Sequence, residues 1–316
     1  MFVARPITGH ARDLTVFLPS AKLPVRETLA DVGASAEIQS ETAANGHRSV
    51  PTMGIDGLRG AVFKVAREIN LAARLRGQRV GHILYTHSLP RLAKGSFSPI
   101  GAIREALSAD FVPVTCLSGQ PCAGLHSTLD LGLTLLSRLN NNENVLVISA
   151  DAATTHDERF FFNSAMGDAV FGTLLDREEG HRILSYSQMT KVFACAGQLS
   201  ETEDIQAFRA ETHSRMRHVL GHVLACASAD WGDVSAVFPH TPNLPLWDQV
   251  AKLCKVPREL FVTDYIGETG HLNASDCAVH MWRAIRDGRV GAGDLVLLAS
   301  AGFGGTHAAT AIRVGG

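Results

Sequence analysis

Residues 120–151, QPCAGLHSTLDLGLTLLSRLNNNENVLVISAD, place a cysteine, an apolar helix and an apolar strand in immediate succession. Leucines recur after the cysteine at spacings of four, four and three, which is typical of one buried helix face: Leu125, Leu129, Leu133 and Leu136. Residues 144–151 form a nearly continuous apolar run, which predicts a strand covered on both faces. The stretch therefore predicts an α/β protein with Cys122 at the start of a buried helix.

Cys122 is the residue in this stretch best suited to chemistry. A thiol at the first turn of a helix faces unpaired backbone N–H groups and the positive end of the helix dipole. Both favour the thiolate, which is the nucleophilic form of cysteine. Most free cysteines are instead small buried hydrophobes, and Cys122 taken alone fits that interpretation as well.

The composition narrows the class of protein. With 316 residues, 46% of them hydrophobic and 19% charged, the chain is typical of a compact α/β protein. A net charge of −2 gives no electrostatic reason to expect nucleic acid or an anionic membrane as a partner. The first residues resemble neither a signal peptide nor a transit peptide, and no apolar run approaches the ~20 residues that span a bilayer. We therefore expect a cytoplasmic protein.

The six cysteines lack the paired spacing of a metal site. They are scattered along a chain that we expect to be cytoplasmic, so we predict free thiols at Cys116, Cys122, Cys195, Cys226, Cys254 and Cys277. We predict no metal and no bound cofactor, since the chain also carries no dinucleotide fingerprint and no P-loop.

The chain repeats one pattern twice. A strand over 79–87 and an apolar strand over 144–151 in the first half correspond to strands over 234–240 and 294–300 in the second. Helices join the strands in both halves, so each sheet should be covered by helices. We divide the chain into residues 1–172, which carry Cys122, and residues 173–316, and we expect the active site where the halves meet.

Four separate motifs, in this order, carry a resemblance to a known family. They are Gln120–Gly124 (QPCAG), Met166–Gly172 (MGDAVFG), Phe238–Asn243 (FPHTPN), and the run Gly288–Leu298 with the glycine loop Gly302–Thr306. The chain resembles the thiolase superfamily, specifically the β-ketoacyl-acyl-carrier-protein synthase III (KAS III) branch and its acyltransferase relatives. The resemblance implies a duplicated αβαβα layered fold, a homodimer, and acyl-CoA or acyl-carrier-protein thioesters, joined through phosphopantetheine, as substrates.

The resemblance also implies roles for residues of the site. Cys122 would take up the acyl group as a thioester, because a thiolate accepts it with little change in bond energy. His240 ends a strand and would act as a base or hydrogen-bond donor, although it could also tie down a loop. Backbone N–H groups of Cys122 and of the loop Gly302–Gly305, in which Phe303 and Gly304 lie, would form the oxyanion hole.

One position departs from the condensing members of the family. Their catalytic Asn, in a Gly-Asn-Thr segment, falls on His271 here, and Asn273 lies two residues further on. The pattern Gly-His-Leu-x-x-x-Asp is more similar to KAS III-like acyltransferases of polyketide tailoring, in which an Asp at the position of Asp276 joins the Cys and His. We expect Asp276 to orient His240, while a helix-capping role is the alternative. The role of His271, in catalysis or in packing, stays open.

Two further segments have simpler interpretations. Gly167 and Asp168 most resemble a turn and its hydrogen bonds. Phe160, Phe161 and Phe162 are candidates for the wall of an acyl tunnel, although core packing is the more common use of such aromatics.

Several functions fit these observations. The first is an acyltransferase that moves an acyl group through an acyl-S-Cys122 intermediate to an acceptor in natural-product or fatty-acid-related biosynthesis. The second is a decarboxylative condensing enzyme that uses Asn273 or His271 in place of the usual Asn. A non-catalytic partner subunit is a third possibility, and a cysteine hydrolase a fourth.

Overall fold

The structure is a computed structural model that describes residues 2–89, 99–108, 111–161, 164–191 and 202–316. In these residues the main sheet has nine strands in the order β11-β12-β13-β10-β1-β9-β6-β4-β5. The strands of its first part are β1 (Phe2–Phe17), β4 (Arg79–Thr86), β5 (Val114–Leu117), β6 (Glu143–Asp151) and β9 (Ala169–Asp176). Those of its second part are β10 (His181–Thr190), β11 (Val234–Pro239), β12 (Leu295–Gly302) and β13 (Thr306–Arg313).

The strand pairing repeats between the two parts. β4 runs parallel to β6, followed by the antiparallel strands β9 and β1; in the same way β11 runs parallel to β12, followed by the antiparallel strands β13 and β10. A parallel bridge between Val237 and Phe261 takes the place that β5 has beside β4. Antiparallel pairing of β1 with β10 joins the two parts into one sheet. The duplication predicted from the sequence is therefore confirmed.

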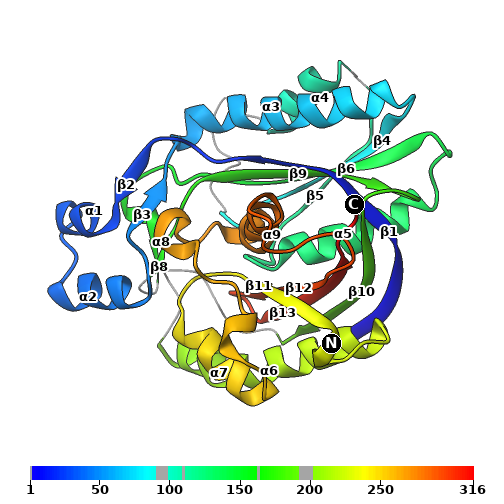
Figure 1. Ribbon diagram of the computed structural model, residues 1–316. Coiled ribbons are helices and arrows are strands. Elements are labelled where there is room, and N and C mark those ends of the chain that lie inside the picture. Colours follow the sequence, from blue (N-terminus) through cyan, green and yellow to red (C-terminus); the bar gives the residue numbers. More distant parts are fainter. Residues whose placement is uncertain (1, 90–98, 109–110, 162–163, 192–201) are drawn as a thin grey trace.

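Helices complete the layers, as Figure 1 shows. Between the two parts of the sheet lie α5 (Gly124–Leu136) and α9 (Asp276–Arg286), whose apolar faces share one core. The outer face of the first part is covered by α3 (Gly54–Leu75) and α4 (Pro99–Leu107), and that of the second by α6 (Thr202–Cys226) and α7 (Pro245–Cys254). The result is the expected α/β fold with five alternating layers.

Shorter elements, most of them from the first half, lie beside the inner helices. They are β2 (Lys22–Pro24), α1 (Val25–Asp31), α2 (Ala36–Ala44), β3 (Ser49–Pro51), the hairpin of β7 (Phe160–Phe161) and β8 (Ser164–Ala165), and α8 (Ile266–Thr269) of the second half. The predicted division after residue 172 falls inside β9, which pairs with β6 as far as Leu175. The repeat itself changes over in the turn at 177–180.

The inner helix α5 lies very close to the sheet. A Cβ atom on Gly132 would be 2.3 Å from Cδ1 of Leu175 and 3.1 Å from Cδ1 of Leu84. Gly60 in α3 is a matched helical glycine with open space around it, since a Cβ there would meet nothing within 4 Å. The position of α5, and with it the turn that carries Cys122, thus depends on the missing side chain at Gly132.

We predict opposite effects of alanine at these two glycines. Gly132→Ala should lower the free energy of unfolding by about 1–3 kcal/mol, because the added methyl group overpacks the interface. Gly60→Ala should raise it by about 0.5–1 kcal/mol, because alanine loses less backbone entropy in a helix. Urea unfolding measures both, and a Gly132→Ala protein as stable as wild type would contradict the close approach.

Candidate active site

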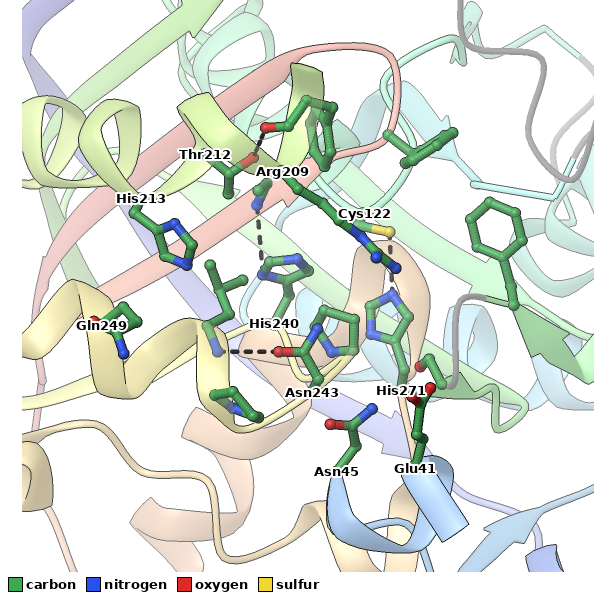
Figure 2. Close-up of a pocket in the computed structure, with 18 of the residues that line it drawn as sticks. Glu41, Asn45, Cys122, Arg209, Thr212, His213, His240, Asn243, Gln249 and His271 are labelled. Atoms are coloured by element: carbon green, nitrogen blue, oxygen red, sulfur yellow. Dashed lines mark hydrogen bonds between the residues drawn. The ribbon is translucent and has the colours of Figure 1, made fainter. Parts of the chain in front are cut away.

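A cavity of about 610 Å³ opens where the two halves meet. Cys122, His240 and His271 all line it, and Figure 2 shows the sulfur of Cys122 directed at the His271 ring with His240 alongside. The rest of the wall consists of Glu41, Ala44, Asn45, Phe161, Ser164, Met166, Phe208, Arg209, Thr212, His213, Pro242, Asn243, Pro245, Leu246, Gln249, Ala301 and Phe303. The cavity thus brings together Cys122 of the QPCAG motif and His240 of the FPHTPN motif, as the sequence predicted.

Cys122, His271 and Asp276 form a hydrogen-bonded row. The Sγ atom of Cys122 is 3.1 Å from Nε2 of His271, and Nδ1 of His271 is 2.5 Å from Oδ2 of Asp276. His271 is 4% exposed and Asp276 is fully buried. A nucleophile, a histidine and an orienting carboxylate in this order have the geometry of a catalytic triad.

The expected partnership of Asp276 with His240 is wrong. Asp276 instead bonds His271, and it accepts hydrogen bonds from the backbone N–H of Thr241 at 2.6 Å and from its hydroxyl at 2.9 Å. The reason is local: the turn over Asn273–Ser275 brings the first residue of α9 back onto His271. Thr241 and His271 thus share Oδ2 of the carboxylate, and the hydrogen bonds of Asp276 include none to His240.

Asn273 is not brought to the nucleophile. Its side chain is 3% exposed, it does not line the cavity, and its amide nitrogen has no hydrogen-bond partner among the described residues. The residue has φ = +56°, in the left-handed region that asparagine tolerates better than most residues. In this structure Asn273 shapes the turn and does not line the cavity beside Cys122.

The backbone of His271 is fixed on both sides by the first half. Its N–H donates to the carbonyl of Ala165 at 2.8 Å, and its carbonyl accepts from Gly167 at 3.0 Å. A Cβ on Gly167 would be 2.3 Å from the carbonyl oxygen of Thr269, so only glycine allows this approach. The segment therefore has the structural role expected for it.

Asp168, the residue after Gly167, holds this segment in place through its buried carboxylate. It forms a buried ion pair with Arg159, at 2.5 Å between Nη1 and Oδ1, and accepts backbone hydrogen bonds from Met53, Gly54 and Ala153. These bonds satisfy a carboxylate that is 1% exposed. Asp168 does not line the cavity, in agreement with its predicted role in a turn.

The turn that carries Cys122 is held between strands of both halves. Cys122 has φ = +63°, a left-handed conformation that is uncommon outside glycine. A Cβ on Gly302 at the end of β12 would be 2.1 Å from the carbonyl oxygen of Pro121, and one on Gly124 would be 2.6 Å from Oγ1 of Thr86 at the end of β4. The approach of Gly302 to backbone leaves room only for glycine, whereas a side chain at Gly124 would require the Thr86 hydroxyl to move.

The oxyanion hole is not assembled as expected at Cys122. The backbone N–H of Cys122 donates to Oγ of Ser88 at 3.0 Å, and Ser88 does not line the cavity. This N–H therefore cannot serve a bound acyl oxygen unless that bond breaks. The loop with Phe303 forms a tight turn closed by Gly305 N–H to the Gly302 carbonyl at 3.1 Å, and an oxyanion role for Phe303 and Gly304 stays a prediction.

The charges of the triad support one another. Burial alone lowers the pKa of His271, but a Cys122 thiolate and the Asp276 carboxylate overcome it and raise that pKa to about 10. Burial would likewise raise the pKa of Asp276, yet the His271 and His280 rings and the Thr241 bond lower it to about 2. An imidazolium at His271 between two negative groups is the state that this geometry favours.

His240 has the opposite electrostatic state. Burial, together with the charge of His271, lowers its pKa well below the usual value, so the ring is neutral at pH 7. The backbone N–H of Ala301 donates to its Nδ1 at 3.4 Å, which leaves the proton of the neutral ring on Nε2. Of the two roles expected for His240, this state favours the hydrogen-bond donor over the base.

Aromatic rings make up much of the apolar wall. The ring of Phe303 contacts those of Phe161 and Phe208 edge-on, with centroids 5.2 and 5.3 Å apart. Of the three phenylalanines singled out in the sequence, Phe161 lines the cavity, Phe160 packs against a separate small core, and Phe162 lies outside the described residues. Phe208 and the other cavity residues of α6 were not predicted, because nothing in their local pattern distinguishes them.

Comparison with known proteins agrees with the site's motifs. Residues 224–314 match the model of the 3-oxoacyl-[acyl-carrier-protein] synthase III C-terminal family. The chain is 29% identical over 246 residues, 71% of its length and 76% of the relative's, to a β-ketoacyl-[acyl-carrier-protein] synthase III of Lactobacillus delbrueckii subsp. bulgaricus. A namesake from Rhizorhabdus wittichii is 27% identical over 161 residues, which is half of that protein. These matches support a KAS III-like protein of the thiolase superfamily.

Solved structures agree with this assignment at the level of fold. ChlB3, described as an acyltransferase, superposes on this chain with a TM-score of 0.82 at 20% identity, covering 98% of both chains. FabH of Pseudomonas aeruginosa gives a TM-score of 0.76 at 19% identity, over 98% of this chain and 99% of its own. OleA of Xanthomonas campestris gives 0.78 at 14% identity, over 97% and 98%. The predicted thiolase-like fold is thereby confirmed.

Two findings concern the described part of the chain only. None of its helices combines the length and apolar character needed to cross a membrane. It also contains no group of three or more His, Cys, Asp or Glu side chains arranged to hold a metal ion.

Proposed function

We propose that this KAS III-like protein is an acyltransferase that moves an acyl group from a CoA or acyl-carrier-protein thioester, through acyl-S-Cys122, to a hydroxyl or amine acceptor. The observation that carries the proposal is the row Cys122–His271–Asp276, with distances of 3.1 and 2.5 Å. A hydroxyl or amine acceptor must lose a proton as it attacks the acyl carbon, so a base is needed beside the acylated sulfur. His271 fits this role because its Nε2 is 3.1 Å from Sγ of Cys122.

In the first half-reaction the Cys122 thiolate would attack the thioester carbonyl. The C–S bond of the donor then breaks, and the departing thiolate takes the proton from the His271 imidazolium, leaving acyl-S-Cys122 and a neutral His271. The Nε2–H of His240, a residue that lines the cavity, would donate to the carbonyl oxygen while negative charge develops on it.

The second half-reaction follows from the change in charge at Cys122. Once the sulfur is acylated, the negative charge that most strongly holds the proton on His271 is gone, so the pKa of the ring falls. Neutral His271 would then take the proton from the acceptor hydroxyl or amine as it attacks the acyl carbon. The Cys122 thiolate leaves, and the starting ion pair is restored. Asp276 would keep the ring oriented throughout.

Decarboxylative condensation is the second candidate. The rings of His240 and His271 lie with centroids 5.6 Å apart and both line the cavity, so two ring N–H donors could share a thioester enolate oxygen. In that reaction His271 would remain a donor, and no base would be required. Release of carbon dioxide from a malonyl thioester distinguishes the two reactions.

We predict a covalent adduct at Cys122 when the protein is mixed with a panel of acyl-CoAs and acyl-carrier-protein thioesters. Intact-protein mass spectrometry should show one acyl mass in wild type and in the control Cys226→Ala, and none in Cys122→Ala. His271→Gln should slow transfer to acceptor by about 10² or more, the usual contribution of a general base.

The malonyl donor decides between the candidates. A stable malonyl adduct without carbon dioxide supports acyl transfer, whereas carbon dioxide release that depends on His240 would favour condensation. No adduct from any donor would contradict both and return the protein to the class of non-catalytic partner subunits.

We also propose that the protein is a homodimer that pairs through β5. This strand is at the edge of the main sheet in the described residues, its Cys116 is exposed, and Phe111 just before it is 97% exposed. An unpaired edge beside an exposed aromatic ring is a surface that needs a partner. Light scattering should give about twice the chain mass of 33.8 kDa. A stable monomer would contradict this proposal.

A further inference from the structure

Two serine-linked bonds connect the nucleophile turn to a buried carboxylate outside the triad. Ser88 follows β4, and its Oγ accepts the backbone N–H of Cys122 at 3.0 Å. The backbone N–H groups of Ser88 and of Leu89 both donate to Oδ1 of Asp151, at 2.8 and 3.0 Å. Asp151 ends β6 and is 1% exposed. A buried carboxylate therefore holds the backbone from which the Ser88 hydroxyl extends.

The same strand end reaches the other side of the triad, at the turn between His271 and Asp276. The hydroxyl of Ser275 in that turn donates to Oγ of Ser149 at 2.9 Å. Ser149 lies in β6, two residues before Asp151. The end of β6 thus contacts both segments that must meet for Cys122 Sγ to lie beside His271. No residue of the triad itself provides this connection.

Cys122 needs such a restraint because of its backbone. A non-glycine residue at φ = +63° is in a sparsely populated conformation, and surrounding contacts must maintain it. The N–H of Cys122 is the group that turns with φ, and its bond to Ser88 points away from the cavity while Sγ points into it. Holding the N–H limits rotation of the peptide plane that precedes Cys122, and so helps to keep the backbone in the conformation from which the sulfur reaches His271.

We propose that Ser88, held by Asp151, is a positioning residue that keeps Cys122 in the left-handed conformation in which its sulfur meets His271. This inference deepens the proposed function and rests on it for the acylation step alone. Ser88 does not line the cavity and would touch no substrate, so it acts only through Cys122.

The test compares Ser88→Ala with Ser88→Thr, which keeps the hydroxyl, and with Ser214→Ala, an exposed serine of α6 whose hydroxyl bonds within its own helix. Two rates are measured at pH 7.5: alkylation of Cys122 by iodoacetamide, followed by peptide mass, and acylation by the preferred donor. Ser88→Ala should lower both by about tenfold, which is about 1.4 kcal/mol. Ser88→Thr should restore both to within about twofold of wild type, and Ser214→Ala should change neither.

The outcomes separate this inference from the proposed function. Slower alkylation in Ser88→Ala, rescued by threonine at an unchanged melting temperature, supports positioning even if no acyl donor reacts. Wild-type or faster alkylation in Ser88→Ala overturns it, and a faster rate would mean that the Ser88 bond restrains the nucleophile from reacting. Equal losses in Ser88→Thr and Ser88→Ala would also overturn it, because the hydroxyl would then not be what matters. A Ser88→Ala protein that fails to fold is replaced by Ser88→Gly, which also removes the hydroxyl and should lower alkylation by about tenfold; wild-type alkylation there would overturn the argument.

Discussion

The contact between Sγ of Cys122 and Nε2 of His271 is the interaction on which the rest of the site depends. The two residues come from different halves of a duplicated fold, so the contact exists only if both inner helices are placed correctly. Gly132 lets α5 approach its sheet, and Gly302 and Gly124 let the cysteine turn lie between the ends of β12 and β4. On the other side, Ala165 and Gly167 hold the backbone of His271. These glycines and backbone hydrogen bonds together position the sulfur of Cys122 beside the ring nitrogen of His271.

Electrostatics divides the two cavity histidines between two tasks. His271 lies between a thiolate and a carboxylate, which raise its pKa to about 10 despite burial. His240 is buried without a carboxylate partner, so its pKa falls and its ring stays neutral, with Nδ1 facing the Ala301 N–H. One ring can thus give and take a proton as the charge on Cys122 changes, while the other donates a hydrogen bond without changing its charge. The two rings differ in charge because Asp276 forms its hydrogen bond with His271 and not with His240.

The sequence predicted the fold well because its signals were local and repeated. Apolar strands over 144–151 and 294–300, and the leucine period after Cys122, each specify their own element, and their recurrence indicated the duplication. The candidate residues Cys122, His240, His271 and Asp276 were also named from their motifs. The partner of Asp276 was wrong, because reach across a turn of five residues depends on the φ of Asn273 and on Thr241, neither of which a motif encodes. Ser88 was missed for the same reason: its bond to Cys122 spans 34 residues and depends on how two strand ends meet.

The protonation state of His271 tests the account most directly. The measurement is a pH titration of the protein with ¹⁵N-labelled histidine, followed by long-range ¹H–¹⁵N correlation spectra, with His271→Gln to assign the signals. A raised pKa means that the ring keeps its proton as the pH rises, so His271 should remain an imidazolium up to about pH 9 and lose its proton near pH 10. In Cys122→Ala, without the thiolate, that loss should occur at lower pH. A wild-type His271 that titrates near the usual 6.5, or whose titration is the same in Cys122→Ala, would contradict the ion pair and with it the proposed chemistry.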